Sequence, residues 1–158
     1  MNRRHFTTTA LALMGSAALT GPKAARAAEN FEVTRTKAEW KAMLSPLEYK
    51  VMRQEGTERA RSSKLDKLYD KGTYVCRGCD LPLYSSETKF DSGTGWPSFY
   101  KAKANAIGTK KDRKLLSVRT ECHCRRCGSH LGHIFDDGPK PTGKRHCING
   151  VSLKFIAA

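Results

Sequence analysis

The chain has 158 residues, with 29 Lys and Arg against 15 Asp and Glu, and its formal charge is +14. Its 6 cysteines are too few for a small disulfide scaffold, in which roughly 8–10% of the residues are Cys. No run approaches the roughly 18–20 uncharged apolar residues of a membrane-spanning helix, whereas 39% apolar residues suffice to fill one core. We therefore expect one soluble, monomeric domain without a membrane anchor.

The first 27 residues have the pattern of an export signal. Two arginines give a basic start, residues 6–20 are uncharged and mostly apolar or small, and residues 25–27 (ARA) have the small-x-small form of a signal peptidase site. Residues 3–6 (RRHF) also resemble the core of a twin-arginine signal, although Asn2 replaces the usual Ser or Thr. The alternative is an unprocessed tail.

Cleavage after residue 27 would leave a domain at residues 28–158 in the periplasm. It would remove four basic residues and no acidic ones, which lowers the charge from +14 to +10. Such a charge is compatible with binding to nucleic acid, an anionic membrane or an acidic partner. The Lys and Arg residues are scattered from Lys37 to Lys154 without a dense block, which indicates a solvated surface instead.

Two short helices are predicted at the start of the domain. Thr36 and Ser45 each stand three residues before a Glu, the pattern of a capping box, and a Pro follows the second of them. We expect helices near residues 37–44 and 46–55, with Gly56 ending the second.

From Gly72 onward, short runs of β-branched and aromatic residues alternate with Gly, Pro, Asp and Ser, so mostly antiparallel β-structure is expected. The runs 115–124 and 145–155 show the alternation of strands, and the second run puts Cys147 and Asn149 on one side.

Two CxxC motifs are the strongest chemical signal, and their cysteines are Cys76, Cys79, Cys124 and Cys127. Four thiolates from two tight turns satisfy a closed tetrahedral zinc site with no open position. The 44 residues between the motifs exceed the roughly 15–20 of a zinc ribbon. One structural zinc per chain is therefore expected to join distant parts of the domain and stabilise it. The alternative is two disulfides, which an oxidising compartment would favour.

Two cysteines remain, Cys122 and Cys147. Cys147 follows Arg145 and His146, whose positive groups would favour the nucleophilic thiolate. Alternatively, Cys147 is a buried strand residue and residues 149–150 (Asn-Gly) form a hairpin turn.

Further segments complete a resemblance to one family. The segments are residues 44–49 (LSPLEY), 56–60 (GTERA), 92–99 (SGTGWPSF), 129–139 (SHLGHIFDDGP) and 145–149 (RHCIN). With the CxxC motifs they resemble the B-type methionine sulfoxide reductases, which reduce the R epimer of methionine sulfoxide, over roughly residues 37–156. Several ordered motifs with matching separations are more specific than any one of them.

The resemblance implies a mainly β fold of two small antiparallel sheets with short N-terminal helices, held by zinc at the ends distant from the active site. It also implies that Cys147 attacks the sulfoxide sulfur, a His protonates the oxygen, methionine leaves and a sulfenic acid remains. His133 would be the principal acid, with His130 and Asn149 helping to place the oxygen.

By the same resemblance, Trp96 and Phe135 would form the apolar wall that takes the substrate methyl group. Arg145 and Asp137 would orient and tune the reacting groups. Oxidised proteins would be the substrates, a thioredoxin-like partner would supply electrons, and no organic cofactor would be needed.

Each of these roles has an alternative. His130 and His133 could bind a second metal with Asp136 or Asp137, or could be hydrogen-bonded surface groups. Trp96 could be a core aromatic in a rigid turn.

The sequence departs from the family pattern at two positions. Thr94 stands where many members carry a resolving Cys, so Cys147 must be recycled by Cys122 or by an external thiol. Cys122 would share a strand face with Val118, which makes a core position the alternative. His146 replaces the usual aromatic residue before the nucleophile and is expected to change the local charge.

Two other function classes remain. A basic zinc module could bind nucleic acid through its +10 charge, but the export signal and the lack of a compact basic stripe oppose this, and we expect no nucleic-acid partner. A secreted disulfide-bonded protein without catalysis would hold little zinc.

Overall fold

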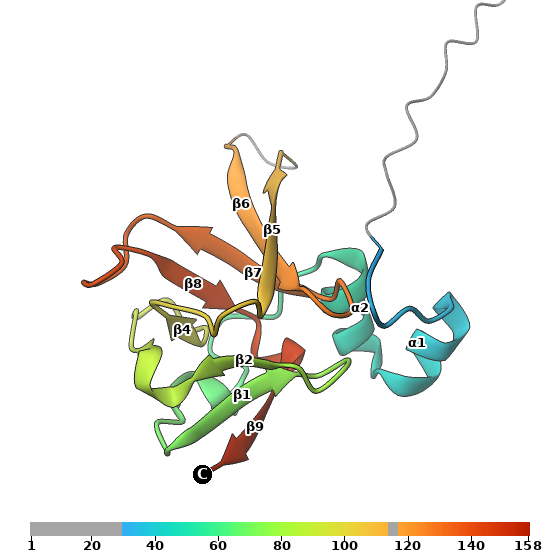
Figure 1. The fold of residues 1–158 in the computed structure, drawn as a ribbon, viewed down its shortest axis with the longest axis horizontal. Helices are drawn as coiled ribbons and strands as arrows, with labels where there is room; N and C mark the ends of the chain where they lie inside the picture. The colour runs from blue at the N-terminus through green and yellow to red at the C-terminus, as the bar shows by residue number, and fades with distance from the viewer. Residues whose placement is uncertain (1–29, 114–116) are drawn as a thin grey trace, which may run out of the picture.

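The structure is a computed structural model that describes residues 30–113 and 117–158. Within those residues, nine strands form two antiparallel sheets, and two short α-helices lie beside them near the N-terminal end of the described chain (Figure 1). The predicted fold class, mainly β with two antiparallel sheets and short N-terminal helices, is confirmed. The export signal predicted at residues 1–27 lies outside the described residues and stays a prediction.

Both predicted helices form: α1 spans Lys37–Met43 and α2 spans Pro46–Gln54. Each begins with a complete capping box, in which Thr36 or Ser45 accepts a hydrogen bond from the backbone N–H of a Glu three residues on. That Glu carboxylate accepts in turn from the capping residue's own N–H. In the described part of the chain, neither helix is long and apolar enough to cross a membrane.

The end of α2 differs from the prediction by one residue. Glu55, rather than Gly56, adopts the left-handed conformation at the helix end, with a φ of 55°. Gly56 is needed for a different reason, because a Cβ at this position would lie 2.9 Å from the carbonyl oxygen of Lys50. The N–H of Gly56 donates to that oxygen at 3.1 Å.

The smaller sheet has the strand order β2-β1-β9 and the larger sheet has the order β3-β4-β8-β7-β6-β5; all pairs are antiparallel. The chain passes from the larger sheet to the smaller one between β8 and β9 (Figure 1). The elements are η1 (Lys64–Lys67), β1 (Gly72–Cys76), β2 (Pro82–Ser85), η2 (Ser86–Thr88), β3 (Lys89–Phe90), β4 (Ser98–Phe99), β5 (Ile107–Asp112), β6 (Arg119–Cys124), β7 (His130–Phe135), β8 (Arg145–Ile148), η3 (Gly150–Ser152) and β9 (Leu153–Ala157).

The alternation expected through residues 145–155 is interrupted. β8 and β9 are separate strands in different sheets, and the short 3₁₀ helix η3 joins them. Asn149 and Gly150 therefore form no hairpin turn, and that alternative is wrong. A Cβ on Gly150 would lie 1.9 Å from the Oγ of Ser63, so this bend requires glycine.

The core contains side chains of both sheets and is built around three aromatic rings. Tyr84 stacks on Phe99 with ring centroids 4.3 Å apart, and Tyr74 meets Phe99 edge-on at 5.0 Å. Helix α2 packs against β7 and η3. Burial of such large apolar side chains is the main source of stability. Other members of this core are Trp40, Leu44, Met52, Leu83, Cys122, Leu131, Ile148 and Leu153.

Candidate active site and metal centre

The two CxxC motifs meet in space although they are far apart in the sequence. The first motif lies between β1 and β2, and the second forms the turn between β6 and β7, so the cluster links the two sheets. The Sγ atoms of Cys76, Cys79, Cys124 and Cys127 all lie within 4.8 Å of one another.

The geometry of this cluster fits a tetrahedral metal ion. The Sγ atoms of Cys76 and Cys127 are 3.6 Å apart and those of Cys79 and Cys124 are 3.5 Å apart. A tetrahedron with Zn–S distances of about 2.3 Å has edges of about 3.8 Å. A disulfide bond is about 2.05 Å long, so the alternative of two disulfides does not describe the cluster. All six cysteines are unpaired.

Backbone hydrogen bonds shape the second motif. The N–H of Gly128 donates to the carbonyl of Cys124 at 2.8 Å, and the N–H of Cys124 donates to the carbonyl of Ser129 at 2.9 Å. Gly128 has a φ of 65°, a left-handed conformation that glycine adopts without strain. The tight turn therefore brings the thiols of Cys124 and Cys127 to the cluster.

A second site is a pocket of about 150 Å³ on the larger sheet, called here the Cys147 pocket. It brings together five of the residues singled out from the sequence, which come from β7, β8, the loop before β4 and the turn after β8. Its lining residues are Thr57, Trp96, Arg119, Gly132, His133, Phe135, Cys147 and Asn149.

Strand register places the nucleophile candidate beside the acid candidate. Cys147 of β8 pairs directly with His133 of β7 on one side and with Ser98 of β4 on the other. Directly paired residues of antiparallel strands project to the same face. Gly132 permits this close packing, because a Cβ there would lie 2.0 Å from the carbonyl oxygen of Cys147.

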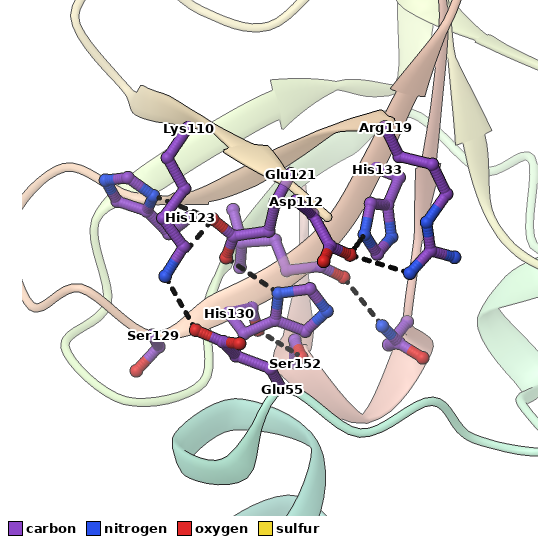
Figure 2. Close-up of polar contacts among 12 residues, drawn as sticks. Glu55, Lys110, Asp112, Arg119, Glu121, His123, Ser129, His130, His133 and Ser152 are labelled. Atoms are coloured by element: carbon purple, nitrogen blue, oxygen red, sulfur yellow. Dashed lines mark hydrogen bonds and ion pairs between the residues drawn. The ribbon is translucent and has the colours of Figure 1, made fainter. Parts of the chain in front are cut away.

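His133 is held by a carboxylate that the sequence reasoning missed. Its Nε2 donates to Oδ2 of Asp112 at 2.8 Å, and the guanidinium of Arg119 donates to the same oxygen at 2.6 Å (Figure 2). Nδ1 of the neutral ring is therefore the nitrogen that can accept a proton. Burial lowers the pKa of His133, and the hydrogen bond that His133 donates to Asp112 opposes that effect.

The sulfur of Cys147 lies among groups that act on its pKa in opposite directions. Burial raises the pKa of the thiol, while the charge of Arg145 and hydrogen bonds from Thr94 and Arg145 lower it. The net shift is upward, so the resting pocket favours the neutral thiol.

Arg145 is held in place on two sides. Asp137 binds its guanidinium through two hydrogen bonds of 2.8 Å, and the ring of Phe135 lies 4.4 Å from the guanidinium carbon. The Asp137 carboxylate, which accepts from a cation in a two-pronged contact, has a lowered pKa. These contacts fix the guanidinium of Arg145, and the role expected for Arg145 and Asp137 in the reaction stays a prediction.

His130 lies behind His133 rather than in the Cys147 pocket. Its ring centroid is 5.5 Å from that of His133, and its Nδ1 donates to Glu121 at 2.7 Å (Figure 2). Burial opposes ionisation of Glu121, but hydrogen bonds from His123 and His130 outweigh it and hold its pKa at about 2. His130 lines a neighbouring charged pocket of about 330 Å³ with Glu121 and Lys110.

The alternative of a second metal is not supported. His130 and His133 contact Glu121 and Asp112, whereas Asp136 pairs with Lys144 and Asp137 with Arg145. In the described part of the chain, the four cysteines of the two motifs are the one group of three or more side chains arranged to hold a metal.

Asn149 uses both ends of its side chain in structural contacts. Its Oδ1 accepts from the backbone N–H of Glu58 at 3.0 Å, and its Nδ2 donates to the carbonyl of Leu131 at 2.9 Å. Asn149 lines the pocket but is 4% exposed. Asn149 therefore holds the backbone of Glu58 and of Leu131 in addition to facing the site.

Trp96 is half-buried at the pocket, which is not the position of a core aromatic. Its Nε1 donates to the backbone carbonyl of Glu58 at 3.1 Å. The indole thus lines the pocket while its polar end is fixed. The contact pairs residues 38 positions apart.

Cys122 and His146 lie on the opposite face of the sheet from Cys147. Cys122 pairs with Gly132 in β7, which pairs with Ile148, the neighbour of Cys147 in β8. Because neighbouring residues of a strand project to opposite faces, the two thiols are on opposite sides. Cys122 is fully buried, and burial raises the pKa of its thiol. This placement favours a core residue over a resolving thiol.

The expectation that His146 adds charge near the nucleophile is wrong. Its Nδ1 lies 3.3 Å from the hydroxyl of Tyr84 in the core, and burial lowers its pKa to about 4. The ring is therefore uncharged at neutral pH. Val118, expected to share a face with Cys122, precedes β6 and is 65% exposed, and residues 115 and 116 of that run lie outside the described residues.

Comparison with known proteins identifies one family. The SelR domain family matches residues 44–157. A peptide methionine sulfoxide reductase MsrB from Leptospira interrogans is 51% identical over 127 residues, which cover 80% of this chain and 97% of that protein. The protein of the same name from Methanosarcina barkeri is 52% identical over 124 residues, 78% of this chain and 87% of the relative. One from Pseudomonas syringae is 50% identical over 126 residues, 79% of this chain and 96% of the relative.

Proposed function

The chain belongs to the B-type peptide methionine sulfoxide reductases, and from this premise we propose that the Cys147 pocket reduces methionine-R-sulfoxide in oxidised proteins to methionine. The main support is the direct pairing of Cys147 with His133 beside the ring of Trp96. The chain is an oxidoreductase, and the residue roles described below are our assignment.

Substrate binding uses the apolar wall of the pocket. The methyl group of the sulfoxide packs against the rings of Trp96 and Phe135, and the oxygen points to the polar side formed by His133. The sulfoxide sulfur is chiral. When its methyl group packs against this wall and its oxygen faces the imidazole, only one of the two epimers also directs its sulfur toward Cys147.

In the chemical step, the sulfur of Cys147 attacks the sulfoxide sulfur. The thiol proton passes through Nδ1 of His133 to the sulfoxide oxygen, which is then transferred to Cys147 as a hydroxyl group. The substrate sulfur gains two electrons and leaves as methionine, and Cys147 loses two and becomes a sulfenic acid. A neutral thiol beside a neutral imidazole is a suitable resting state for this proton transfer.

Recycling requires two thiols from outside the chain. One thiol attacks the sulfenic acid and releases water, which leaves a mixed disulfide, and a second thiol releases Cys147. Thr94 is close enough to hydrogen-bond Cys147 but carries no sulfur, and Cys122 lies on the other face of the sheet. A thioredoxin-like dithiol protein is the reductant that fits this chemistry.

Zinc is the metal we assign to the four cysteines. All four positions of a tetrahedral ion are filled by thiolates, so the ion would have no place for substrate and would act by joining the two sheets. From the export signal predicted at residues 1–27, we also propose that the enzyme works in the periplasm, and we expect it to be a monomer.

The direct test uses separated R and S epimers of a methionine sulfoxide peptide. The purified chain is incubated with each epimer and dithiothreitol, and methionine is measured by chromatography. We expect reduction of the R epimer alone, because the wall and His133 fix the orientation of the sulfur. A folded, metal-loaded protein that reduces neither epimer would refute the proposed function.

Removal of the carboxylate behind His133 should slow the chemical step. Asp112 raises the pKa of His133 through its hydrogen bond, so Asp112→Asn should lower that pKa further and make the imidazole a weaker acceptor for the thiol proton that it passes to the oxygen. We expect the single-turnover rate to fall about 10- to 100-fold, within the range for general acid catalysis. Because the resting imidazole must be neutral to accept that proton, the loss of rate at acidic pH, where His133 becomes protonated, should begin at a lower pH than in the wild type.

This prediction is measured with reduced enzyme and one equivalent of substrate between pH 5 and 9, which removes the reductant from the rate. Asp136→Asn is the matched control, since Asp136 pairs with the exposed Lys144 and does not contact His133. An unchanged rate and pH profile in Asp112→Asn would exclude a role for Asp112.

A further inference from the structure

Glu58 is a buried carboxylate for which the proposed mechanism has no role. Its exposed fraction is 2%, and it lies in the segment between α2 and β1, more than 90 residues from its side-chain partners. A buried charge is costly unless hydrogen bonds satisfy it. The partners of Glu58 therefore show what it holds.

The carboxylate of Glu58 caps η3, the turn that follows the nucleophile strand. Its oxygens accept from the backbone N–H groups of Gly150 and Val151, the second at 3.1 Å. Asn149 is the N-cap residue of η3, but its own side chain makes no capping bond. Glu58 thus supplies from a distant segment the acceptor that a helix start requires.

The backbone of Glu58 binds two residues of the Cys147 pocket. Its N–H donates to Oδ1 of Asn149 at 3.0 Å, and its carbonyl accepts from Nε1 of Trp96 at 3.1 Å. A neighbouring bond, from the N–H of Arg61 to the carbonyl of Gly95 at 2.7 Å, holds the loop just before the indole. One short segment therefore ties the Trp96 loop to the end of the Cys147 strand.

We propose that Glu58 is a positioning residue that fixes the indole of Trp96 relative to the Cys147 strand and so sets how closely the pocket fits the sulfoxide methyl group. The inference rests on the proposed function of the pocket. The Nε1 bond is the polar contact of the indole, and its acceptor is the residue whose carboxylate anchors the segment on η3. If the carboxylate is lost, the acceptor moves and the ring can rotate.

The test compares methionine sulfoxide with ethionine sulfoxide, which carries one additional methylene at the position of the methyl group. A well-fitted pocket discriminates against an added methylene by roughly 10-fold or more in kcat/KM. We expect Glu58→Ala to lose most of this discrimination and to lower kcat/KM for methionine sulfoxide by about 10-fold or more. Glu58→Gln, which keeps one acceptor, should have a smaller effect of the same kind.

A double-mutant cycle distinguishes positioning from general destabilisation. Trp96→Phe keeps an aromatic wall but lacks the N–H that donates to the backbone carbonyl of Glu58. The effects of Glu58→Gln and Trp96→Phe on discrimination should therefore not add. Leu83→Ala is the control. Leu83 is fully buried in β2 and does not line the pocket, so its variant should lose thermal stability but keep the discrimination of the wild type.

Additive effects in the cycle, or Glu58 variants with lowered melting temperature but wild-type discrimination, would overturn the inference. Should Glu58→Ala fail to fold, Glu58→Gln decides the question. A wild type that reduces neither substrate would instead refute the proposed function, and a wild type that reduces methionine sulfoxide alongside unaffected Glu58 variants would refute the positioning role alone.

Discussion

Cys147→Ser should abolish reduction of methionine-R-sulfoxide, with a loss of about 10³-fold or more, as expected when the nucleophile of an enzyme is removed. A serine hydroxyl is a much weaker nucleophile than a thiol and forms no sulfenic acid. His133 cannot compensate, because it contributes a proton and no electrons. The substitution changes one atom in a half-buried side chain, so the fold should persist.

The measurement uses the separated epimers with dithiothreitol, and a sulfenic acid trap detected by mass spectrometry reports the intermediate. The trap should label Cys147 after one turnover in the wild type and nothing in Cys147→Ser. Cys122→Ala is the matched control, because Cys122 is the other cysteine outside the metal cluster. It should keep turnover both with dithiothreitol and with a dithiol protein.

Two outcomes would contradict this assignment. Turnover that survives in Cys147→Ser would show that the nucleophile lies elsewhere. Turnover of Cys122→Ala with dithiothreitol but not with a dithiol protein would show that Cys122 resolves the sulfenic acid. The second result would require the sheet to open, because the two thiols project to opposite faces.

Loss of the metal should unfold the domain. Structural zinc contributes about 10–16 kcal/mol in zinc-finger peptides, which matches or exceeds the roughly 5–15 kcal/mol by which most proteins are stable. In this chain the cluster joins the β1–β2 hairpin to the β6–β7 turn, so both sheets depend on it. Cys124→Ser should therefore be unfolded or strongly destabilised at 25 °C.

Metal analysis and thermal melting measured by circular dichroism test this prediction. The wild type should contain one zinc per chain, release it to a strong chelator and lose its cooperative transition. Cys122→Ala, with the four ligands intact, should keep one zinc. A metal-free wild type that melts cooperatively, or a mass that indicates two disulfides, would refute the structural zinc.

The sequence by itself determined what depends on neighbours along the chain. Capping boxes at Thr36 and Ser45 predicted both helices, because their hydrogen bonds span three residues. The alternation after Gly72 predicted a mainly β fold, and the CxxC spacing predicted the metal cluster. The ordered motifs also selected the family and most of the residues that line the Cys147 pocket.

Only the tertiary structure decided the contacts that depend on strand register. Asp112 reaches His133 because of the register in which β5 pairs with β6 and β6 with β7. No local spacing in the sequence predicts that contact. The same register places Cys122 and His146 on the face opposite Cys147. The sequence predicts only that all of them lie in strands.

Glu58 is the clearest case of a residue that the sequence alone does not explain. Its partners are the N–H groups of a turn more than 90 residues away, and hydrogen bonds to backbone leave no signal in side-chain patterns. Local signals fix elements within a few residues, whereas functional geometry depends on which distant backbone groups meet when the two sheets close around the core.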